Sequence, residues 1–303
     1  MGESMDIRVK KNDLPALFRA ADSGSVTAQR HYSQLIAIDL TLLVIAAILG
    51  SLALASTQAK GALALASAII LGVSIIVTGL IRIIRFEQVW YDGRAIAESV
   101  KSLAWRYMTC TEPYSHGLKA ASLDQKFTSD LSSILAERSD FSSRLGGPLT
   151  RESQITKCMR EVRKLNTEGR EKVYLSDRIN DQRRWYGEKT DTNQKSASRL
   201  FLAMIVSQIL ALIAAIILVR WPAVPINPTG ILVTLAAVFF AWLQFRRHQE
   251  LARSYGLAAQ ELGLICEQAR HVKTADELSN FVSDSENAIS REHTLWLARR
   301  NQR

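Results

Sequence analysis

The chain has 303 residues, 48% of them apolar, with a net charge of +9 and a pI of about 9.6. The apolar residues gather in four blocks separated by polar stretches, which excludes a soluble domain of evenly mixed composition. Three cysteines without a close pair, Cys110, Cys158 and Cys266, exclude a CxxC zinc motif and give no sign of a disulfide framework.

The N-terminal region predicts a short amphipathic helix. Asn12 and Asp13 precede Leu14-Pro15, and proline favours the first turn of a helix. Apolar residues then recur on one face at helical spacing: Leu14, Leu17, Phe18 and Ala21. The first 34 residues are polar and mixed in charge, so we expect no signal peptide here.

Two long apolar runs follow, at 35–56 and 61–81, and only residues 57–60 separate them. The only charged residue in either run is Asp39. A helix of about 20 apolar residues spans a hydrocarbon core of about 30 Å. The pair therefore predicts a transmembrane helical hairpin, with two buried helices of a large soluble core as the alternative.

The helix of the second run is predicted to continue beyond the membrane edge at Arg82 and Arg85, giving about 50 residues in all. Apolar and small residues alternate along the extension at steps of four and three: Phe86, Trp90, Gly93, Ala97, Val100, Ala104 and Tyr107. Such a stripe requires a packing partner.

The middle of the chain, 112–199, is polar. It predicts a short helix at 123–136 and a break at residues 146–148, Gly-Gly-Pro. The stretch 174–186 is densely charged, which is typical of a solvated helix with salt bridges on its surface.

The hairpin pattern then returns. The runs are 200–219 and 226–245, Pro222, Pro225 and Pro228 mark the turn between the two helices, and Arg246-Arg247 closes the fourth span. The helix is again predicted to continue, with a stripe at Leu251, Tyr255, Ala258, Leu262, Ile265 and Ala269. Thr274 and Glu277 have capping-box spacing and predict the start of a last helix.

Together these elements predict an all-α membrane protein with four transmembrane helices in two hairpins and long cytoplasmic amphipathic helical extensions. We expect a first hairpin unit at 12–112, a cytoplasmic helical segment at 113–177 and a second hairpin unit at 178–303. The two short loops carry little charge besides Lys60 and Arg220. The positive-inside rule therefore places both termini in the cytoplasm of a multi-pass protein of the inner (plasma) membrane.

Motif searches indicate no enzyme: there is no phosphate-binding glycine loop, HExxH or GxSxG, and no catalytic, cofactor-binding or metal-binding residue is predicted. We expect no nucleic-acid partner, because membrane edges account for much of the basic charge.

Polar residues within the spans are the candidate pore-lining or gating residues: Asp39, Ser67, Ser74, Thr78, Ser207 and Gln208. Asp39 lies near the cytoplasmic edge. It either lines a mouth for cations or reaches back to Arg30, Arg82 or the headgroups. A ladder of small residues, Ala203, Ser207, Ala211 and Ala215, predicts close helix packing, within one chain or between chains.

The segment 178–186, with Lys189 and Asn193 just before a hairpin, resembles the SLATT family of two-transmembrane domains. So do the extension after the second span and the C-terminal pattern that includes Phe281 and Glu286. The N-terminal stretch from Leu14 to Asp22 fits a subtype with two fused units. The residues that match the family motifs, and that we expect to serve in packing, are Trp90, Arg94, Trp105, Arg178, Gln182, Trp185, Tyr186, Glu292, His293 and Trp296.

The resemblance implies a pore-forming effector of a bacterial anti-phage or nucleotide-signal conflict system. Such a protein would form homo-oligomers in the lipid bilayer and permeabilise it after activation, causing growth arrest or death. A nucleotide-second-messenger sensor or synthase would be its partner. The alternative is a non-conducting membrane scaffold or sensor that recruits cytoplasmic partners.

Overall fold

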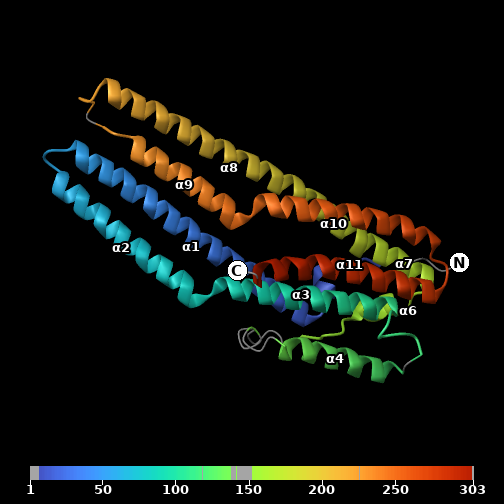
Figure 1. The fold of residues 1–303 in the computed structure, drawn as a ribbon. Coiled ribbons are helices and arrows are strands. Elements are labelled where there is room, and N and C mark those ends of the chain that lie inside the picture. Colours follow the sequence, from blue (N-terminus) through green and yellow to red (C-terminus); the bar gives the residue numbers. More distant parts are fainter. Residues whose placement is uncertain (1–6, 118, 138–140, 142–151, 225, 302–303) are drawn as a thin grey trace. The chain divides into compact units, whose positions relative to one another are not determined.

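The computed structural model describes residues 7–117, 119–137, 141, 152–224 and 226–301 (Figure 1). Within these ranges every regular element is helical, which confirms the predicted all-α fold. The elements are η1 (Lys11–Asp13), α1 (Ala16–Ala55), α2 (Lys60–Ile84), α3 (Phe86–Thr109), α4 (Ala120–Ala136), α6 (Lys157–Lys164), α7 (Thr167–Tyr174), η3 (Leu175–Asn180), α8 (Asp181–Arg220), α9 (Thr229–Arg246), α10 (His248–Gln268), η4 (Ala269–His271) and α11 (Ala275–Asn301).

The chain divides into two compact units. The hairpin unit comprises Arg30–Phe86 and Lys189–Arg253, and it holds the two apolar hairpins. The core unit comprises Met1–Gln29, Glu87–Glu188 and Ser254–Arg303. Each unit is thus assembled from stretches that are far apart in the sequence.

The hairpin unit has its large apolar side chains on the outside. Four helical stretches are long and apolar enough to cross a membrane: Ala16–Ala55, Lys60–Thr109, Thr167–Arg220 and Thr229–His271. Leu54 and Ile83 are 80% and 76% exposed. Small side chains fill much of the inside, among them Ala46, Ala53, Ala211 and Ala236. This arrangement suits lipid as the solvent, since small residues let membrane helices approach closely.

Contacts along α1 join the two hairpins within this unit. In Figure 1, α1 lies beside α2, and α8 beside α9. The Ser51 hydroxyl donates to the carbonyl of Asn227, just before α9, at 2.8 Å. Toward the other end of α1, the rings of Tyr32 and Phe245 meet edge to face at 5.2 Å. The two hairpins therefore form one four-helix body.

The structure differs from the sequence prediction where each hairpin ends. α2 and α3 are separate helices, because Arg85 between them has the left-handed conformation (φ 56°, ψ 39°). Arg247 separates α9 from α10 in the same way (φ 48°, ψ 36°). A non-glycine residue pays about 1–2 kcal/mol for this conformation. By contrast, α1 and α8 are unbroken over 40 residues each.

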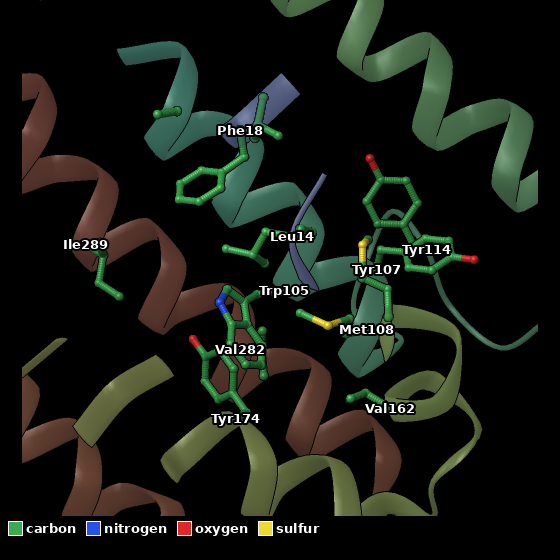
Figure 2. Packing of buried hydrophobic residues seen from close by; sticks show 14 of the residues in the cluster. Leu14, Phe18, Trp105, Tyr107, Met108, Tyr114, Val162, Tyr174, Val282 and Ile289 are labelled. Carbon is green, nitrogen blue, oxygen red and sulfur yellow. The ribbon is translucent and has the colours of Figure 1, made fainter. Parts of the chain in front are cut away.

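The core unit buries the apolar stripes that the sequence predicts. Leu14, Leu17, Phe18 and Ala21 are all buried, as are Ala97, Val100, Ala104 and Tyr107 of α3. Ala258, Leu262 and Ala269, which lie on the stripe that begins in α10, join the same cluster. Figure 2 shows Leu14 and Phe18 together with Trp105 and Met108 in this core.

The last helix begins as predicted. The backbone N–H of Glu277 donates to the Thr274 hydroxyl at 3.2 Å, and the Glu277 carboxylate accepts the N–H of Thr274 at 2.9 Å. This capping box satisfies backbone donors that a helix start leaves open.

Candidate functional site

A carboxylate joins the two helices of the first hairpin. The Ser74 hydroxyl donates to Asp39 Oδ1 at 2.6 Å, and the Thr78 hydroxyl lies 3.4 Å from the same oxygen. The partners of Asp39 in the structure are hydroxyls on α2, and its two expected roles stay predictions. The structure thus brings together three of the six candidate residues. Sequence spacing places Ser74 and Thr78 on one face of α2 but does not reveal that Asp39 faces them.

The other candidates in the hairpin unit do not join this cluster. Ser67 donates to the carbonyl of Ala46 at 3.0 Å, a second link between α2 and α1. Ser207 donates to the carbonyl of Ala203 within its own helix at 2.8 Å. Ser207 and Ala211 are buried, so this part of the small-residue ladder packs within the chain.

Gln208 lies on the exposed surface of α8. It is the ninth residue of the uncharged run 200–219, so it lies near the middle of the predicted span. Its neighbours Ile209, Leu210 and Leu212 are exposed apolar residues. In a bilayer, this surface is apolar apart from one primary amide.

The family-motif residues gather in the core unit, where α3 faces the segment α7–η3–α8. On α3 they belong to a row at four- and three-residue steps: Arg94, Glu98, Lys101 and Trp105. Three contacts cross to the facing segment: Arg94 lies over the Trp185 ring at 5.7 Å, Lys101 Nζ lies 3.4 Å from Gln182 Oε1, and the Trp105 and Tyr174 rings meet edge to face at 5.6 Å. The contacts occur in opposite sequence order, so the two segments run antiparallel here.

A buried ion pair anchors the segment that faces α3 to the last helix. Arg178 donates through Nε and Nη2 to the two carboxylate oxygens of Glu286, at 2.9 and 2.8 Å. The Tyr174 hydroxyl donates to Glu286 Oε1 at 3.1 Å. The side chains of Arg178 and Glu286 are only 1% and 0% exposed. The expectation of a solvated helix at 174–186 is wrong for this face, because Tyr174, Arg178, Ile179, Gln182 and Tyr186 are buried.

The charges of the pair set the pKa values around it. Burial works against the charge on Arg178, but the Glu286 carboxylate outweighs it and raises the Arg178 pKa. Burial, followed by the negative charge of Glu286, raises the Tyr174 pKa well above its usual value. Arg178 is thus held charged and Tyr174 neutral, so that the phenol remains a hydrogen-bond donor.

Arg178 lies in a π-helical segment, η3, which is inserted between α7 and α8. A π-helical turn widens the helix locally and is frequent at functional sites. Here it changes the register between Tyr174 and Gln182, both of which contact the α3 row.

The remaining motif residues have separate roles. The Trp90 backbone carbonyl accepts a hydrogen bond from the Ser25 hydroxyl at 2.9 Å, and the Trp90 ring stacks on the Tyr91 ring. The Tyr186 ring packs against Tyr255 of α10. The side chains of Glu292, His293 and Trp296 lie outside the described residues. Among the residues that the structure does describe, no three His, Cys, Asp or Glu side chains gather as a metal site.

Sequence reasoning missed the importance of Lys101 and the partner of Arg178. Lys101 follows Arg94 and Glu98 at helical spacing, and this spacing was the available signal. The link to Glu286 has no local signal, since 108 positions separate the two residues.

An all-helical protein with two tandem hairpins that can cross a membrane is the class that this architecture defines. The family described as SMODS and SLOG-associating 2TM effector domain 3 matches residues 15–171, and domain 1 of the same description matches residues 174–296. The chain therefore belongs to the SLATT family and consists of two fused SLATT units. No curated protein and no solved structure matches it.

Proposed function

We propose that this protein is a gated, self-associating membrane effector of a bacterial anti-phage or nucleotide-signal conflict system. After activation, its hairpins would permeabilise the membrane and cause growth arrest or death. The family description as an effector domain with two transmembrane helices supports this role. The proposed partner is a nucleotide-second-messenger sensor or synthase.

Gln208 is the observation that carries the proposal. A polar group facing hydrocarbon without a hydrogen-bond partner costs several kcal/mol. Gln208 is exposed on a surface that is otherwise apolar, near mid-span, so one chain alone in a bilayer would pay this cost. A second copy relieves it, because a primary amide both donates and accepts and can pair with its counterpart. Self-association brings several hairpin units together, which a pore requires.

In each hairpin, one helix continues into the core-unit residues without a break and the other ends at a break, and this difference supports a gating role. α1 and α8 run unbroken from core-unit residues into the spans, whereas the chain leaves the spans through breaks at Arg85 and Arg247, both within the hairpin unit. A signal received by the core unit would therefore act on hairpins with one continuous and one hinged connection each. The bond between Asp39 and Ser74 would hold the first hairpin in its resting arrangement.

Basic residues support the proposed orientation. Arg82, Arg85, Arg246 and Arg247 lie at the ends of the spans near the core-unit segments, while the short connections hold Lys60 and Arg220. Both termini would then lie in the cytoplasm, and the membrane would be the inner (plasma) membrane.

A non-conducting scaffold is the second candidate function. Leu257 and Leu264 lie seven residues apart on α10 and are 60% and 68% exposed. Residues at this spacing share one helix face, which is typical of a surface that docks another helix. A scaffold would use this face to recruit a cytoplasmic partner.

The test is inducible expression in bacteria with paired measurements of self-association and membrane integrity. Cross-linking in isolated membranes reports association, and propidium entry together with membrane potential reports permeability. We expect Gln208→Leu to weaken association about 3- to 30-fold, from about 0.6–2 kcal/mol per interhelical hydrogen bond, and to reduce dye entry. Gln125→Leu makes the same change on an exposed surface of α4 in the core unit and should leave both unchanged. Intact membranes in activated cells would overturn the pore and favour the scaffold.

A further inference from the structure

The core unit contains a pocket beside the row of motif residues on α3. Its cavity volume is about 260 Å³, just below the range of about 300–1,000 Å³ that is typical of small-molecule sites. The N-terminal segment and the start of α1 form one wall, and α3, η3 and α8 form the others. Its lining includes Lys10, Phe18, Lys101, Trp105, Asp181 and Trp185.

The acidic side chains of the pocket mostly have partners already. Four acidic and four basic side chains line it. Asp22 forms an ion pair with Lys11, and Glu98 one with Arg94 at 3.8 Å. Asp177 accepts the backbone N–H of Val9 at 2.7 Å and the Ser176 hydroxyl at 2.7 Å.

One acidic and two basic side chains of the lining remain after these pairs. Asp181, the acid, is exposed on the first turn of α8. Lys10, one of the bases, is also exposed, whereas Lys101 is partly buried. The Asp22 and Asp177 carboxylates of the lining thus already have donors.

Two hydrogen-bond donors of the inner lining have either no acceptor or only a distant one. Trp105 is 1% exposed, and its indole N–H has no hydrogen-bond partner among the described residues. Figure 2 shows the indole nitrogen on the side of the ring turned away from Met108. A buried donor without an acceptor is destabilising, because it has given up its hydrogen bonds to water. The indole is thus a buried donor at the pocket wall that lacks an acceptor.

Lys101 is a second donor in the pocket lining, and its hydrogen bond within the protein is weak. Its hydrogen bond to Gln182 Oε1 is long at 3.4 Å. Burial, and then the positive charge of Arg178, lower the Lys101 pKa, while Glu98, Glu286 and Asp181 act in the opposite direction. Glu98 and Asp181 of the lining thus act on the ammonium group through space, and Gln182 is its hydrogen-bond acceptor.

We infer that this pocket binds a small ligand that carries an oxyanion, a carboxylate or a phosphate group, with the Lys101 ammonium and the Trp105 indole N–H as donors. An oxyanion supplies the acceptor that the Trp105 indole lacks and a closer one than Gln182 for Lys101, and hydrogen bonds to charged groups are the stronger ones. Phe18 and Trp185 provide apolar walls for the body of the ligand. Binding of such a ligand goes beyond the proposed membrane function and holds whether or not the hairpins conduct.

The test measures binding to the full-length protein purified in a neutral detergent. The probes are inorganic pyrophosphate and citrate at constant ionic strength, with chloride as reference, and the readouts are calorimetric Kd and Tm. At a ligand concentration of 100 Kd, we expect Tm to rise by about 5 °C, from about 2.7 kcal/mol of linkage. Failure of this test would leave the permeability measurements untouched, so the two proposals fail separately.

Two variants locate the binding site. Lys101→Met removes the charge at similar volume, and we expect it to weaken binding about 10- to 100-fold. Trp105→Phe keeps the ring and removes only the N–H, and we expect a loss of about 3- to 10-fold. Lys157→Met and Trp221→Phe make the same changes at exposed positions, with the Lys157 side chain 92% exposed, and should bind like the wild type.

The outcomes are distinct. Binding that only the two pocket variants lose supports the site. No binding of either probe, or equal loss in pocket and control variants, overturns it.

A further arm compares nanodiscs of phosphatidylglycerol with nanodiscs of phosphatidylcholine. If pyrophosphate competes equally in both, the ligand is a soluble molecule. If phosphatidylglycerol alone blocks the probe in a Lys101-dependent way, the oxyanion is a lipid headgroup.

Discussion

Arg178 and Glu286 form a two-point ion pair that closes the core unit across 108 positions of sequence. The guanidinium comes from the π-helical segment before α8, and the carboxylate comes from the middle of α11. Tyr174 donates a third hydrogen bond to the same carboxylate. The start of the second SLATT unit is therefore fastened to its last helix by a buried polar network, which is costly to disturb.

The first prediction is that removing one partner of this pair destabilises the protein strongly. Arg178→Met or Glu286→Met leaves one buried charge without its partner, which costs about 3–5 kcal/mol. Thermal unfolding of the purified protein in detergent measures this as a lower Tm. Because the double substitution leaves no unpaired charge, we expect it to unfold at a higher temperature than either single variant.

An exposed ion pair is the control for this prediction. Arg270 and Glu267 pair at 2.9 Å, with side chains 74% and 61% exposed. Arg270→Met should change the free energy of unfolding by less than about 1 kcal/mol. If the double variant at 178 and 286 loses as much as the two single variants together, the pair makes no coupled contribution.

The ion pair also shows which kind of feature the sequence alone does not predict. The capping box at Thr274 and Glu277 and the apolar stripe that starts at Leu14 are confirmed, because both are local patterns that the helix itself fixes. Burial of Arg178 is different. A charged stretch is normally solvated, and only a partner from α11 makes it an interior segment. Local periodicity carries no information about that partner.

The helix break at the edge of the first hairpin is a second feature that the sequence does not predict. An apolar stripe that continues at helical spacing predicts an unbroken helix through Arg85, yet the residue is left-handed. Helix propensity does not anticipate this, since arginine is a good helix former. The break at the equivalent place in the other hairpin, at Arg247, is also at an arginine that no helix breaker accompanies.

The second prediction concerns this break. If Arg85 is left-handed, Arg85→Gly should be more stable than Arg85→Ala by about 1 kcal/mol, because glycine adopts this conformation without a steric penalty. A straight helix through this position reverses the order, since glycine then costs about 1 kcal/mol relative to alanine. The ranking of the two Tm values therefore decides between a hinge and a continuous helix. The same pair of variants at Arg247 repeats the test.

The third prediction concerns Gly93, where α3 lies against its neighbours. A Cβ atom at this position would lie 2.7 Å from Phe141 Cζ and 3.1 Å from the carbonyl oxygen of Ala21. The Phe141 ring can move, but the backbone of α1 moves less readily. Gly93→Ala should therefore destabilise the protein by about 1–3 kcal/mol, seen as a lower Tm.

Gly187 in α8 is the matched control for this substitution. Nothing lies within 4 Å of a Cβ atom added there, so Gly187→Ala should gain up to about 1 kcal/mol of helix propensity. Equal effects at the two glycines would contradict the close contact at Gly93.

The fourth prediction is a pH dependence that originates at Lys101. Burial and the charge of Arg178 lower its pKa in the folded protein, whereas the unfolded chain keeps a value of about 10.4. Between these two values the unfolded chain binds a proton that the folded protein does not. The free energy of unfolding should therefore rise with pH in this window and fall as pH decreases through it.

The measurement compares Tm from about pH 8 to about pH 10 in the wild type and in Lys101→Met. The variant lacks the titrating group, so its Tm should rise less over this range. Lys157→Met, which removes an exposed lysine, should follow the wild type. Parallel curves for all three proteins would show that Lys101 titrates normally.

The fifth prediction concerns the bond between Asp39 and Ser74, which joins α1 and α2 at 2.6 Å. A hydrogen bond from a hydroxyl to a carboxylate contributes about 1.5–3 kcal/mol. A double-mutant cycle with Asp39→Asn and Ser74→Ala should give a coupling energy of about 1–2 kcal/mol, because Thr78 remains near the same oxygen. Ser67→Ala, paired with Asp39→Asn, should give a coupling near zero, since Ser67 bonds the carbonyl of Ala46.

If the bond between Asp39 and Ser74 holds the resting hairpin, Ser74→Ala should also increase propidium entry in expressing cells, whereas Ser67→Ala should not. A coupling near zero for Asp39 and Ser74 would remove the carboxylate from the gating proposal and leave Gln208 as its support.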